Sequence, residues 1–293
     1  MPAGATTLIE RLARGLLVLD GATGTELERR GVPTPAPLWS AAALVTAPRV
    51  VEAIHRDYVD AGADIVVANT FRTNPRTLHN AGRFEDGPAL NRLAVEWVRR
   101  AAGDRPVLVA ASVGPVEDCY HPERVPEEAV LLDEHRQMVA WLEDAAPDLI
   151  WIETIGTVRE ARAAAQAATQ RGLSFAASFV TQENGDLLGG EPLEATVAAL
   201  EPLSPLALGL NCIPPRGLTA ILPRLRRLTD RPLAAYAHIA NPTPLRGWSY
   251  AQNITPAEYA DYARQWLDLG ASIVGGCCGT TPMHIRAVRD AIA

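Results

Sequence analysis

The sequence places two cysteines side by side near its C-terminal end. Cys277 and Cys278 stand in the stretch GGCCGTTPMHI (275–285), and the chain has only four cysteines. Adjacent thiolates repel one another and oxidise readily unless a cation holds them. A vicinal disulfide and a chance pairing in a glycine-lined turn are the alternatives. The pair therefore points to metal binding, and the flanking glycines are expected to let backbone approach the metal.

A third cysteine, Cys212, follows another short apolar run. Three soft sulfur ligands suit Zn²⁺, and three protein ligands leave the fourth tetrahedral position open, as at catalytic sites. Zinc held by three thiolates is a poor Lewis acid toward water, but it keeps a coordinated thiolate electron-rich. A free thiol has a pKa of about 8.5 and loses its proton on coordination. The pattern therefore predicts a site that activates a thiol substrate as a nucleophile. Cys119, in the segment EDCYHPERVP, is interpreted as a small buried hydrophobe, and its role stays open.

Short apolar runs and helix-compatible segments alternate along the chain. We predict eight strands, at 16–20, 64–69, 107–113, 148–154, 174–180, 206–211, 233–238 and 272–276. The segment 48–63 begins with proline and the segment 157–172 ends with glycine, which favours helices between the strands. Continuously apolar strands alternating with helices are typical of a parallel (β/α)8 barrel. We therefore predict the α/β class, with one TIM-barrel domain over residues 1–293.

Polar and thiol residues stand where several of these predicted strands end. Catalytic groups of a (β/α)8 barrel lie at the C-terminal ends of its strands. The strand ends carry Asp20, Asn69, Glu153, Asn211 with Cys212, and Cys277 with Cys278. The sequence therefore predicts that these residues share one rim of the barrel.

The composition excludes several classes of function. All 27 basic residues are arginine, so Schiff-base chemistry on a lysine amine is excluded. A net charge of −7 without a basic run argues against nucleic-acid or membrane partners. The N-terminal segment has no continuous apolar stretch, and no run approaches the ~18 residues of a membrane span. Few cysteines in so long a chain form no secreted disulfide framework, so we predict a cytoplasmic protein.

Four segments together resemble a known family. They are DGATGTELERRG (20–31), IET (152–154), NC (211–212) and GGCCGTTPMHI (275–285). They are similar to the homocysteine S-methyltransferases, which include betaine- and S-methylmethionine-dependent enzymes and the homocysteine-binding module of cobalamin-dependent methionine synthase. The resemblance extends over residues 16–290 and implies a zinc-containing barrel in which Cys212, Cys277 and Cys278 bind the metal. It further implies that homocysteine thiolate becomes the fourth ligand and is methylated to methionine.

The same resemblance implies roles for residues that bind the amino-acid part of homocysteine. Carboxylates matching Asp20 and Glu153 receive the ammonium group, and the Gly21 and Ala22 backbone lies near the substrate carboxylate. The alternatives are that Asp20 caps a turn and that Glu153 pairs with a buried arginine.

Three further residues complete the predicted acceptor site. Asn69 and Thr70, where the second predicted strand ends, are also expected to bind substrate. Asn211 is expected to orient the loop that carries Cys212.

The residues around 37–78 bear on the methyl donor. The segment LWSA (38–41) resembles the S-methylmethionine enzymes, whereas ANTF (68–71) resembles the methionine synthase module. Betaine enzymes carry a tyrosine where this chain has Arg72, and a guanidinium is a poor neighbour for a quaternary ammonium. Trp39 and Phe71 could instead cover a sulfonium.

The predicted partners are small molecules: homocysteine and a methyl donor. The 293 residues leave no room for a folate or cobalamin domain, so the donor expected is S-methylmethionine or S-adenosylmethionine. A subunit that takes methyl from a separate corrinoid protein is the alternative. Two alternatives from other classes are a phosphate-binding barrel lyase or isomerase and a non-catalytic zinc- or thiol-binding protein.

Overall fold

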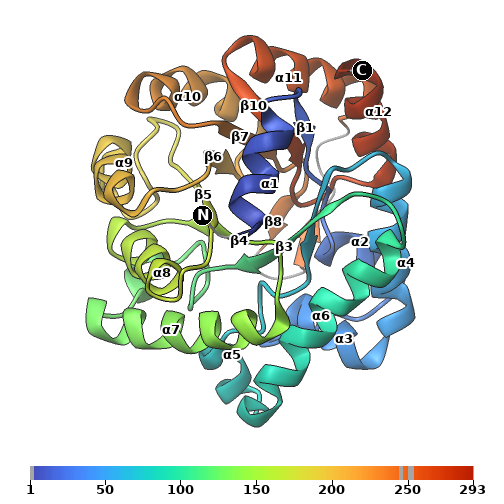
Figure 1. Cartoon of the computed structure of the whole chain (residues 1–293), viewed down its shortest axis with the longest axis vertical. Helices are drawn as coiled ribbons and strands as arrows, with labels where there is room; N and C mark the ends of the chain where they lie inside the picture. Colours follow the sequence, from blue (N-terminus) through green and yellow to red (C-terminus); the bar gives the residue numbers. More distant parts are fainter. Residues whose placement is uncertain (1–2, 244–246, 250–253, 293) are drawn as a thin grey trace.

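Eight parallel strands form the centre of the molecule, as the sequence predicted (Figure 1). The computed structural model describes residues 3–243, 247–249 and 254–292. The strands are β1 (Leu17–Val18), β2 (Ile65–Ala68), β3 (Leu108–Val113), β4 (Leu149–Ile155), β5 (Phe175–Phe179), β6 (Leu208–Asn211), β7 (Leu233–Ala237) and β10 (Ala271–Gly276). The prediction of a (β/α)8 barrel is confirmed.

The sheet closes on itself between its first two strands in the chain. Hydrogen-bonded neighbours follow the order β1, β10, β7, β6, β5, β4, β3, β2. Leu19 and Ile65 then form a parallel bridge, while the Asp64 amide donates to the Val18 carbonyl over 2.7 Å. Because all the strands point the same way, their C-terminal ends form one rim.

Helices surround the barrel and follow every strand. The long ones are α4 (Pro48–Asp60), α6 (Gly87–Ala102), α7 (Glu128–Ala145), α8 (Val158–Gln170), α9 (Leu193–Leu200), α10 (Pro215–Leu228), α11 (Pro256–Asp268) and α12 (Pro282–Ile292). Shorter helices are α2 (Gly24–Arg29), α3 (Ala43–Thr46) and α5 (Pro75–Asn80), with 3-10 turns at Trp39–Ala42, Phe84–Asp86, Pro122–Arg124 and Glu201–Leu203. The predicted helices within 48–63 and 157–172 are α4 and α8. The Thr157 hydroxyl caps α8 by accepting from the Glu160 amide. Within the described residues, no helix is both long enough and apolar enough to cross a membrane.

Two elements were not predicted from the sequence. Helix α1 (Ala3–Leu12) lies across the open end of the barrel, in front of the strands in Figure 1. Its Leu8 is fully buried among barrel-interior residues such as Leu17 and Leu108, so α1 covers the end opposite the rim. Strands β8 (Asn241–Thr243) and β9 (Gly247–Ser249) pair as an antiparallel hairpin after β7.

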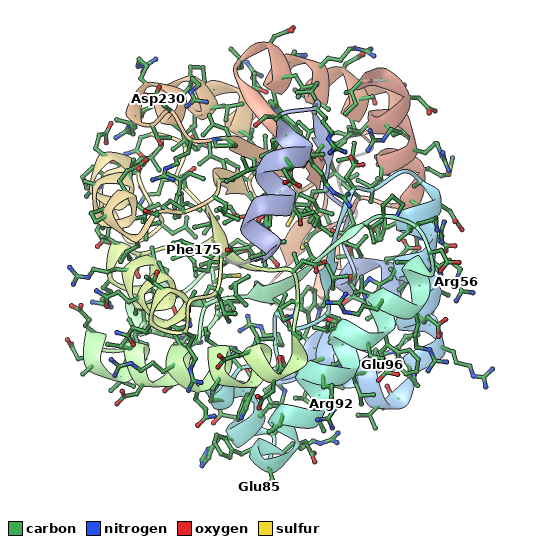
Figure 2. The ribbon with its side chains drawn as sticks, viewed as in Figure 1. Arg56, Glu85, Arg92, Glu96, Phe175 and Asp230 are labelled. Atoms are coloured by element: carbon green, nitrogen blue, oxygen red, sulfur yellow. The ribbon has the colours of Figure 1, made fainter. Side chains whose placement is uncertain are left out.

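Side chains fill the barrel interior, so the barrel is a packed core. Trp151 and Tyr236 meet edge to face with ring centroids 6.2 Å apart, and the indole donates to the Tyr236 hydroxyl over 2.8 Å. Figure 2 shows the charged side chains of Arg56 and Glu85 at the outer edge of the molecule, whereas Phe175 lies inside. The interior thus ends, toward the rim, in a polar hydroxyl that can support the residues above it.

A buried histidine on α4 makes stability depend on pH. His55 is fully buried, and neither ring nitrogen has a partner among the described residues. Burial lowers its pKa to about 4, from the ordinary 6.5. Between these values the unfolded chain binds the proton and the folded chain does not, so stability falls as pH falls from 6.5 toward 4, by up to about 3 kcal/mol. Denaturant unfolding of His55→Leu should lack this part of the pH dependence. An unchanged slope would contradict it.

Candidate active site

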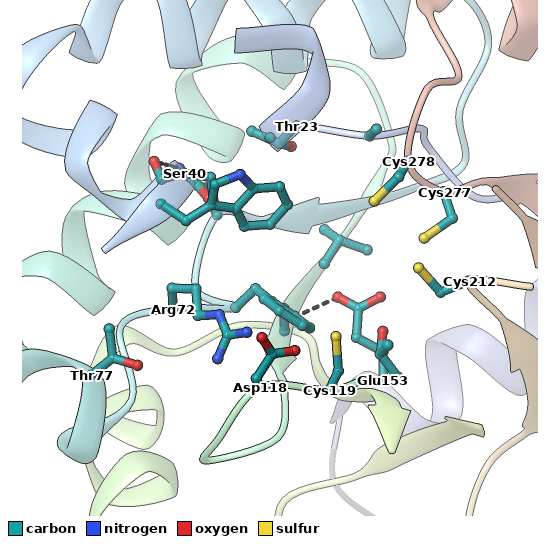
Figure 3. A pocket seen from close by; sticks show the side chains of 18 of the residues that line it. Thr23, Ser40, Arg72, Thr77, Asp118, Cys119, Glu153, Cys212, Cys277 and Cys278 are labelled. Carbon is teal, nitrogen blue, oxygen red and sulfur yellow. Dashed lines mark hydrogen bonds between the residues drawn. The ribbon is translucent and has the colours of Figure 1, made fainter. Parts of the chain in front are cut away.

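A pocket of about 850 Å³ opens at the C-terminal rim of the barrel (Figure 3). Its walls come from the segments that follow the strands, as expected for this fold. The predicted residues that line it are Asp20, Gly21, Ala22, Trp39, Asn69, Phe71, Arg72, Glu153, Cys212, Cys277 and Cys278. Its volume suits small molecules of amino-acid size.

Three cysteines converge on one wall of this pocket. The sulfur atoms of Cys212, Cys277 and Cys278 all lie within 4.8 Å of one another, and none forms a disulfide. Figure 3 shows the three thiol groups pointing toward one another from two different strand ends. In the described part of the chain, this is the one group of three or more His, Cys, Asp or Glu side chains with metal-binding geometry. Three soft donors so close together fit a thiophilic cation such as zinc.

Backbone hydrogen bonds fix the cysteine pair after β10. The Cys277 amide donates to the Ala237 carbonyl over 3.0 Å, and the Cys278 carbonyl accepts from the Ile239 amide over 2.8 Å. The sequence analysis expected the glycines before the pair to make room beside the metal. The structure gives them a different role. A Cβ on Gly275 would lie 2.6 Å from Cβ of Leu19, and one on Gly276 would overlap Thr280. Gly275 instead lets β10 pack closely against β1, and Gly276 leaves space for the Thr280 side chain in the turn after β10.

Two residues that the sequence analysis missed contact Cys212. The Tyr120 hydroxyl lies 3.3 Å from the Cys212 sulfur, and His238 forms a side-chain hydrogen bond that lowers the pKa of Cys212. The net pKa of Cys212 is nonetheless raised, chiefly by its hydrogen bond with Cys277. The pKa of Cys277 is lowered to about 5, because Cys212 and Cys278 hydrogen-bond to it, whereas that of Cys278 is raised. One thiol therefore ionises readily, and a cation is needed before all three can.

Two carboxylates, one buried and one half-buried, face the same pocket. Asp20 is 2% exposed and accepts a hydrogen bond from the Val67 amide over 3.0 Å. Glu153 accepts from the Ser112 hydroxyl over 2.5 Å and from the Tyr236 hydroxyl over 3.3 Å. Burial raises the pKa of both carboxyls, that of Glu153 to about 7, and each carboxylate would find a positive charge favourable. Among the described residues no arginine or histidine forms an ion pair with either carboxylate, so the alternative of a buried arginine partner for Glu153 finds no support there.

A bulge in β4 turns Glu153 toward the pocket. The register between β4 and β5 shifts between Ile152 and Ile155, and Thr154 has a φ of 61°. The Asn211 side chain holds this bulge: its oxygen accepts from the Thr154 amide over 3.0 Å and its nitrogen donates to the Thr154 hydroxyl over 2.8 Å. Asn211 therefore supports the strand end that carries Glu153, a role that the sequence analysis did not predict, and its expected role in orienting the Cys212 loop stays a prediction.

Two aromatic rings form another part of the pocket wall. Trp39 and Phe71 meet edge to face with centroids 6.2 Å apart. Each ring sits where a neighbouring glycine has no side chain, because a Cβ on Gly24 would overlap Trp39 and one on Gly114 would lie 2.6 Å from Phe71. The sequence analysis found the two rings but not the glycines that seat them.

The remaining predicted residues have supporting positions. The Asn69 side chain lines the pocket but donates to the Ser40 carbonyl over 2.8 Å. Thr70 is not among the lining residues, and its hydroxyl donates to the Ser112 carbonyl over 2.7 Å, so its predicted substrate contact is not present. Cys119 lines the pocket, and burial raises the pKa of its thiol, which keeps it protonated and unreactive.

Comparisons with known proteins agree with this arrangement. A family model described as homocysteine S-methyltransferase matches residues 17–292. The crystal structure of the homocysteine methyltransferase MmuM from Escherichia coli, metallated form, has a TM-score of 0.84 and 32% identity, covering 98% of this chain and 99% of that one. Homocysteine S-methyltransferase 1 of Brassica oleracea var. italica is 31% identical over 97% of this chain and 95% of the relative. A selenocysteine Se-methyltransferase of the same plant is 29% identical over 94% of this chain and 88% of the relative. The chain therefore belongs to the homocysteine S-methyltransferase family and is a transferase.

Proposed function

We propose that this enzyme transfers a methyl group from S-methylmethionine to the thiolate of L-homocysteine. The observation that carries the proposal is the presence, in one pocket, of three convergent thiols and two carboxylates, Asp20 and Glu153, that have no cationic partner among the described residues. An amino acid with a thiol side chain supplies an ammonium for the carboxylates and a sulfur atom for the cysteine cluster.

The chain's own residues would bind and orient the acceptor. Asp20 and Glu153 receive the ammonium, and Ser112 and Tyr236 hold the Glu153 carboxylate in place. The backbone of Gly21 and Ala22, which also lines the pocket, lies beside the acceptor carboxylate. This pre-arranged binding fixes the acceptor sulfur near the three cysteines and reduces the entropic part of the barrier.

We further propose that Cys212, Cys277 and Cys278 hold a zinc ion. The cluster fits zinc because its three sulfur atoms are close, soft and free of disulfides. Without a cation the neighbouring thiols raise the pKa of Cys278, so the three thiols do not ionise together. When bound, zinc would supply deprotonation of the substrate thiol at neutral pH.

The donor binds beside Trp39, whose ring lines the pocket next to the cysteine cluster and offers an aromatic face to a sulfonium. In the proposed reaction, the homocysteine thiolate attacks the methyl carbon and forms a new carbon–sulfur bond. The old bond to the sulfonium breaks, and its electron pair stays on the leaving sulfur. Homocysteine and S-methylmethionine thus give two molecules of methionine. No further base is required once the thiol is deprotonated.

The deciding experiment measures zinc content and methionine formation together. Freshly reduced protein would be offered homocysteine with S-methylmethionine, S-adenosylmethionine, betaine and methylcobalamin in parallel. We expect about one zinc per chain and turnover with S-methylmethionine. Turnover with methylcobalamin alone would replace the proposed donor with a corrinoid partner, and zinc without any turnover would favour a binding role.

The packing of the Phe71 ring on Gly114 gives a prediction for binding of the methyl donor. Gly114→Ala places a methyl group where the Phe71 ring lies, so the ring must move. Phe71 packs edge to face against Trp39, so its displacement should disturb the ring beside the sulfonium. We expect the KM for S-methylmethionine to rise by up to about tenfold, the size of a cation–π contact, while the KM for homocysteine stays unchanged. Steady-state kinetics with each substrate varied in turn measure both. Gly217→Ala, at a glycine with open space around it, is the control. Equal effects on both KM values would contradict the assignment.

We propose a cytoplasmic location, because the cysteine cluster must stay reduced to bind a metal. Three thiols within 4.8 Å of one another stay reduced and able to bind metal in a reducing compartment.

A further inference from the structure

Arg72 lines the pocket without a carboxylate partner. Three arginines line the pocket in the described part of the chain: Arg72, Arg76 and Arg124. Arg76 pairs with Glu117 and Glu134, and Arg124 lies 4.0 Å from Glu123. Arg72 instead donates one hydrogen bond, from Nη1 to the Glu117 carbonyl over 2.9 Å. No carboxylate among the described residues forms an ion pair with it.

This arginine is held in place without being neutralised. Its guanidinium carbon lies 5.1 Å from the centroid of the Phe71 ring, and the side chain is half-buried. The ring contact and the Glu117 carbonyl restrict the side chain, while four N–H groups have no acceptor among the described residues. A restricted, unpaired guanidinium that faces a pocket suits a carboxylate or phosphate ligand.

The position of Arg72 separates it from the acceptor site. Figure 3 shows Arg72 and Thr77 on the side of the pocket opposite Cys277 and Cys278. The acceptor's ammonium and sulfur are assigned to the cysteine side, so a negative group near Arg72 would belong to the second substrate.

The spacing of charges within the donor then matters. In S-methylmethionine three carbons separate the sulfonium from the carboxylate, whereas in betaine one carbon separates the quaternary nitrogen from its carboxylate. A guanidinium can therefore bind the carboxylate of S-methylmethionine while the sulfonium stays away from it, beside Trp39. In betaine the methyl-bearing nitrogen lies one carbon from the carboxylate, so a carboxylate held by the guanidinium would keep the methyl groups on the Arg72 side of the pocket, away from the cysteines (Figure 3).

We propose that Arg72 binds the carboxylate of the methyl donor and so selects a free sulfonium amino acid. This assignment rests on the proposed function and adds a residue that determines donor specificity. It places the donor's methyl end toward the cysteines and its carboxylate end on the opposite side of the pocket, at Arg72 (Figure 3).

The test compares two donors that differ only in the carboxylate. S-methylmethionine and its neutral carboxamide would be assayed at saturating homocysteine with the wild-type enzyme, Arg72→Gln and Arg72→Lys. In the wild type we expect kcat/KM to be about 10- to 100-fold lower for the carboxamide. Arg72→Gln should lower kcat/KM for S-methylmethionine by a similar factor, mainly through KM, and change it for the carboxamide by less than about threefold. Arg72→Lys should recover part of the loss.

The control is Arg100→Gln, since Arg100 also lies over an aromatic ring, Trp97, but outside the pocket. It should leave the preference between the donors unchanged. Equal losses for both donors in Arg72→Gln, or a wild type that does not distinguish them, would overturn the role of Arg72 while leaving the proposed function standing. A wild type that uses only methylcobalamin would overturn the proposed donor and this assignment together. The KM for homocysteine reports whether a variant has folded correctly.

Discussion

Cys278→Ala is expected to lose bound zinc and methionine formation together. The cluster holds three sulfur atoms within 4.8 Å, and a two-sulfur remnant lacks the donors for a stable site. Without the cation, most of the substrate molecules keep a protonated thiol at neutral pH, so turnover should fall by on the order of 10³-fold or more. Metal analysis of purified protein and a methionine assay measure the two losses.

Cys119→Ser is the matched control, because Cys119 lines the same pocket but lies outside the three-sulfur cluster. It should keep both zinc and activity. A zinc-free Cys278→Ala enzyme with normal turnover would refute the metal's role. A Cys119→Ser enzyme without zinc would show that Cys119 also contributes to the metal site.

Glu153→Gln should impair homocysteine binding while leaving zinc in place. The amide keeps the shape of the side chain but removes the charge that would pair with the substrate ammonium. We expect the KM for homocysteine to rise about 10- to 100-fold, the value of a hydrogen bond to a charged group. The KM for the donor should not change. Loss of zinc in this variant, or an unchanged KM for homocysteine, would contradict the assigned role.

The same residue predicts how acceptor binding depends on pH. Burial raises the pKa of Glu153 to about 7, although the Ser112 hydrogen bond opposes the shift. Above pH 7 the carboxylate is charged and binds an ammonium. Below pH 7 it is increasingly protonated, so affinity should weaken by up to about tenfold per pH unit. Asp20, whose pKa burial also raises, acts in the same direction. Calorimetric titration with methionine, which has no titrating thiol, should show this dependence in the wild type and a weaker one in Glu153→Gln.

The sequence was most informative where a single residue type, or a simple pattern of apolar residues, decides the structure. Continuous apolar runs predicted all eight barrel strands, and the strand-end position of Cys212 and the cysteine pair predicted that the thiols would meet. These inferences succeed because parallel strands, buried on both faces, have few alternatives and because their ends share one rim.

Other features depend on contacts between distant segments, which one sequence does not reveal. Asn211 bonds Thr154, 57 residues earlier, and only the β4 bulge explains why. His238 and Tyr120 reach Cys212 from other loops. His238 ends the predicted strand 233–238, so its position at a strand end could have predicted a place at the rim. Tyr120 lies in a loop, and no comparable pattern in the sequence indicated its contact with Cys212. The seating of Phe71 on Gly114 likewise required coordinates.

Helix α1 has a consequence for the order of catalytic events. Because α1 and the packed interior close one end of the barrel, both substrates must pass through the same mouth. In the proposed function the acceptor binds among the carboxylates and thiols at the strand ends, and the donor binds on the Arg72 side of the same pocket (Figure 3). We therefore expect an ordered addition, in which homocysteine binds before the methyl donor. A large excess of donor should then occupy the entrance of the empty enzyme and slow turnover, a substrate inhibition that added homocysteine relieves.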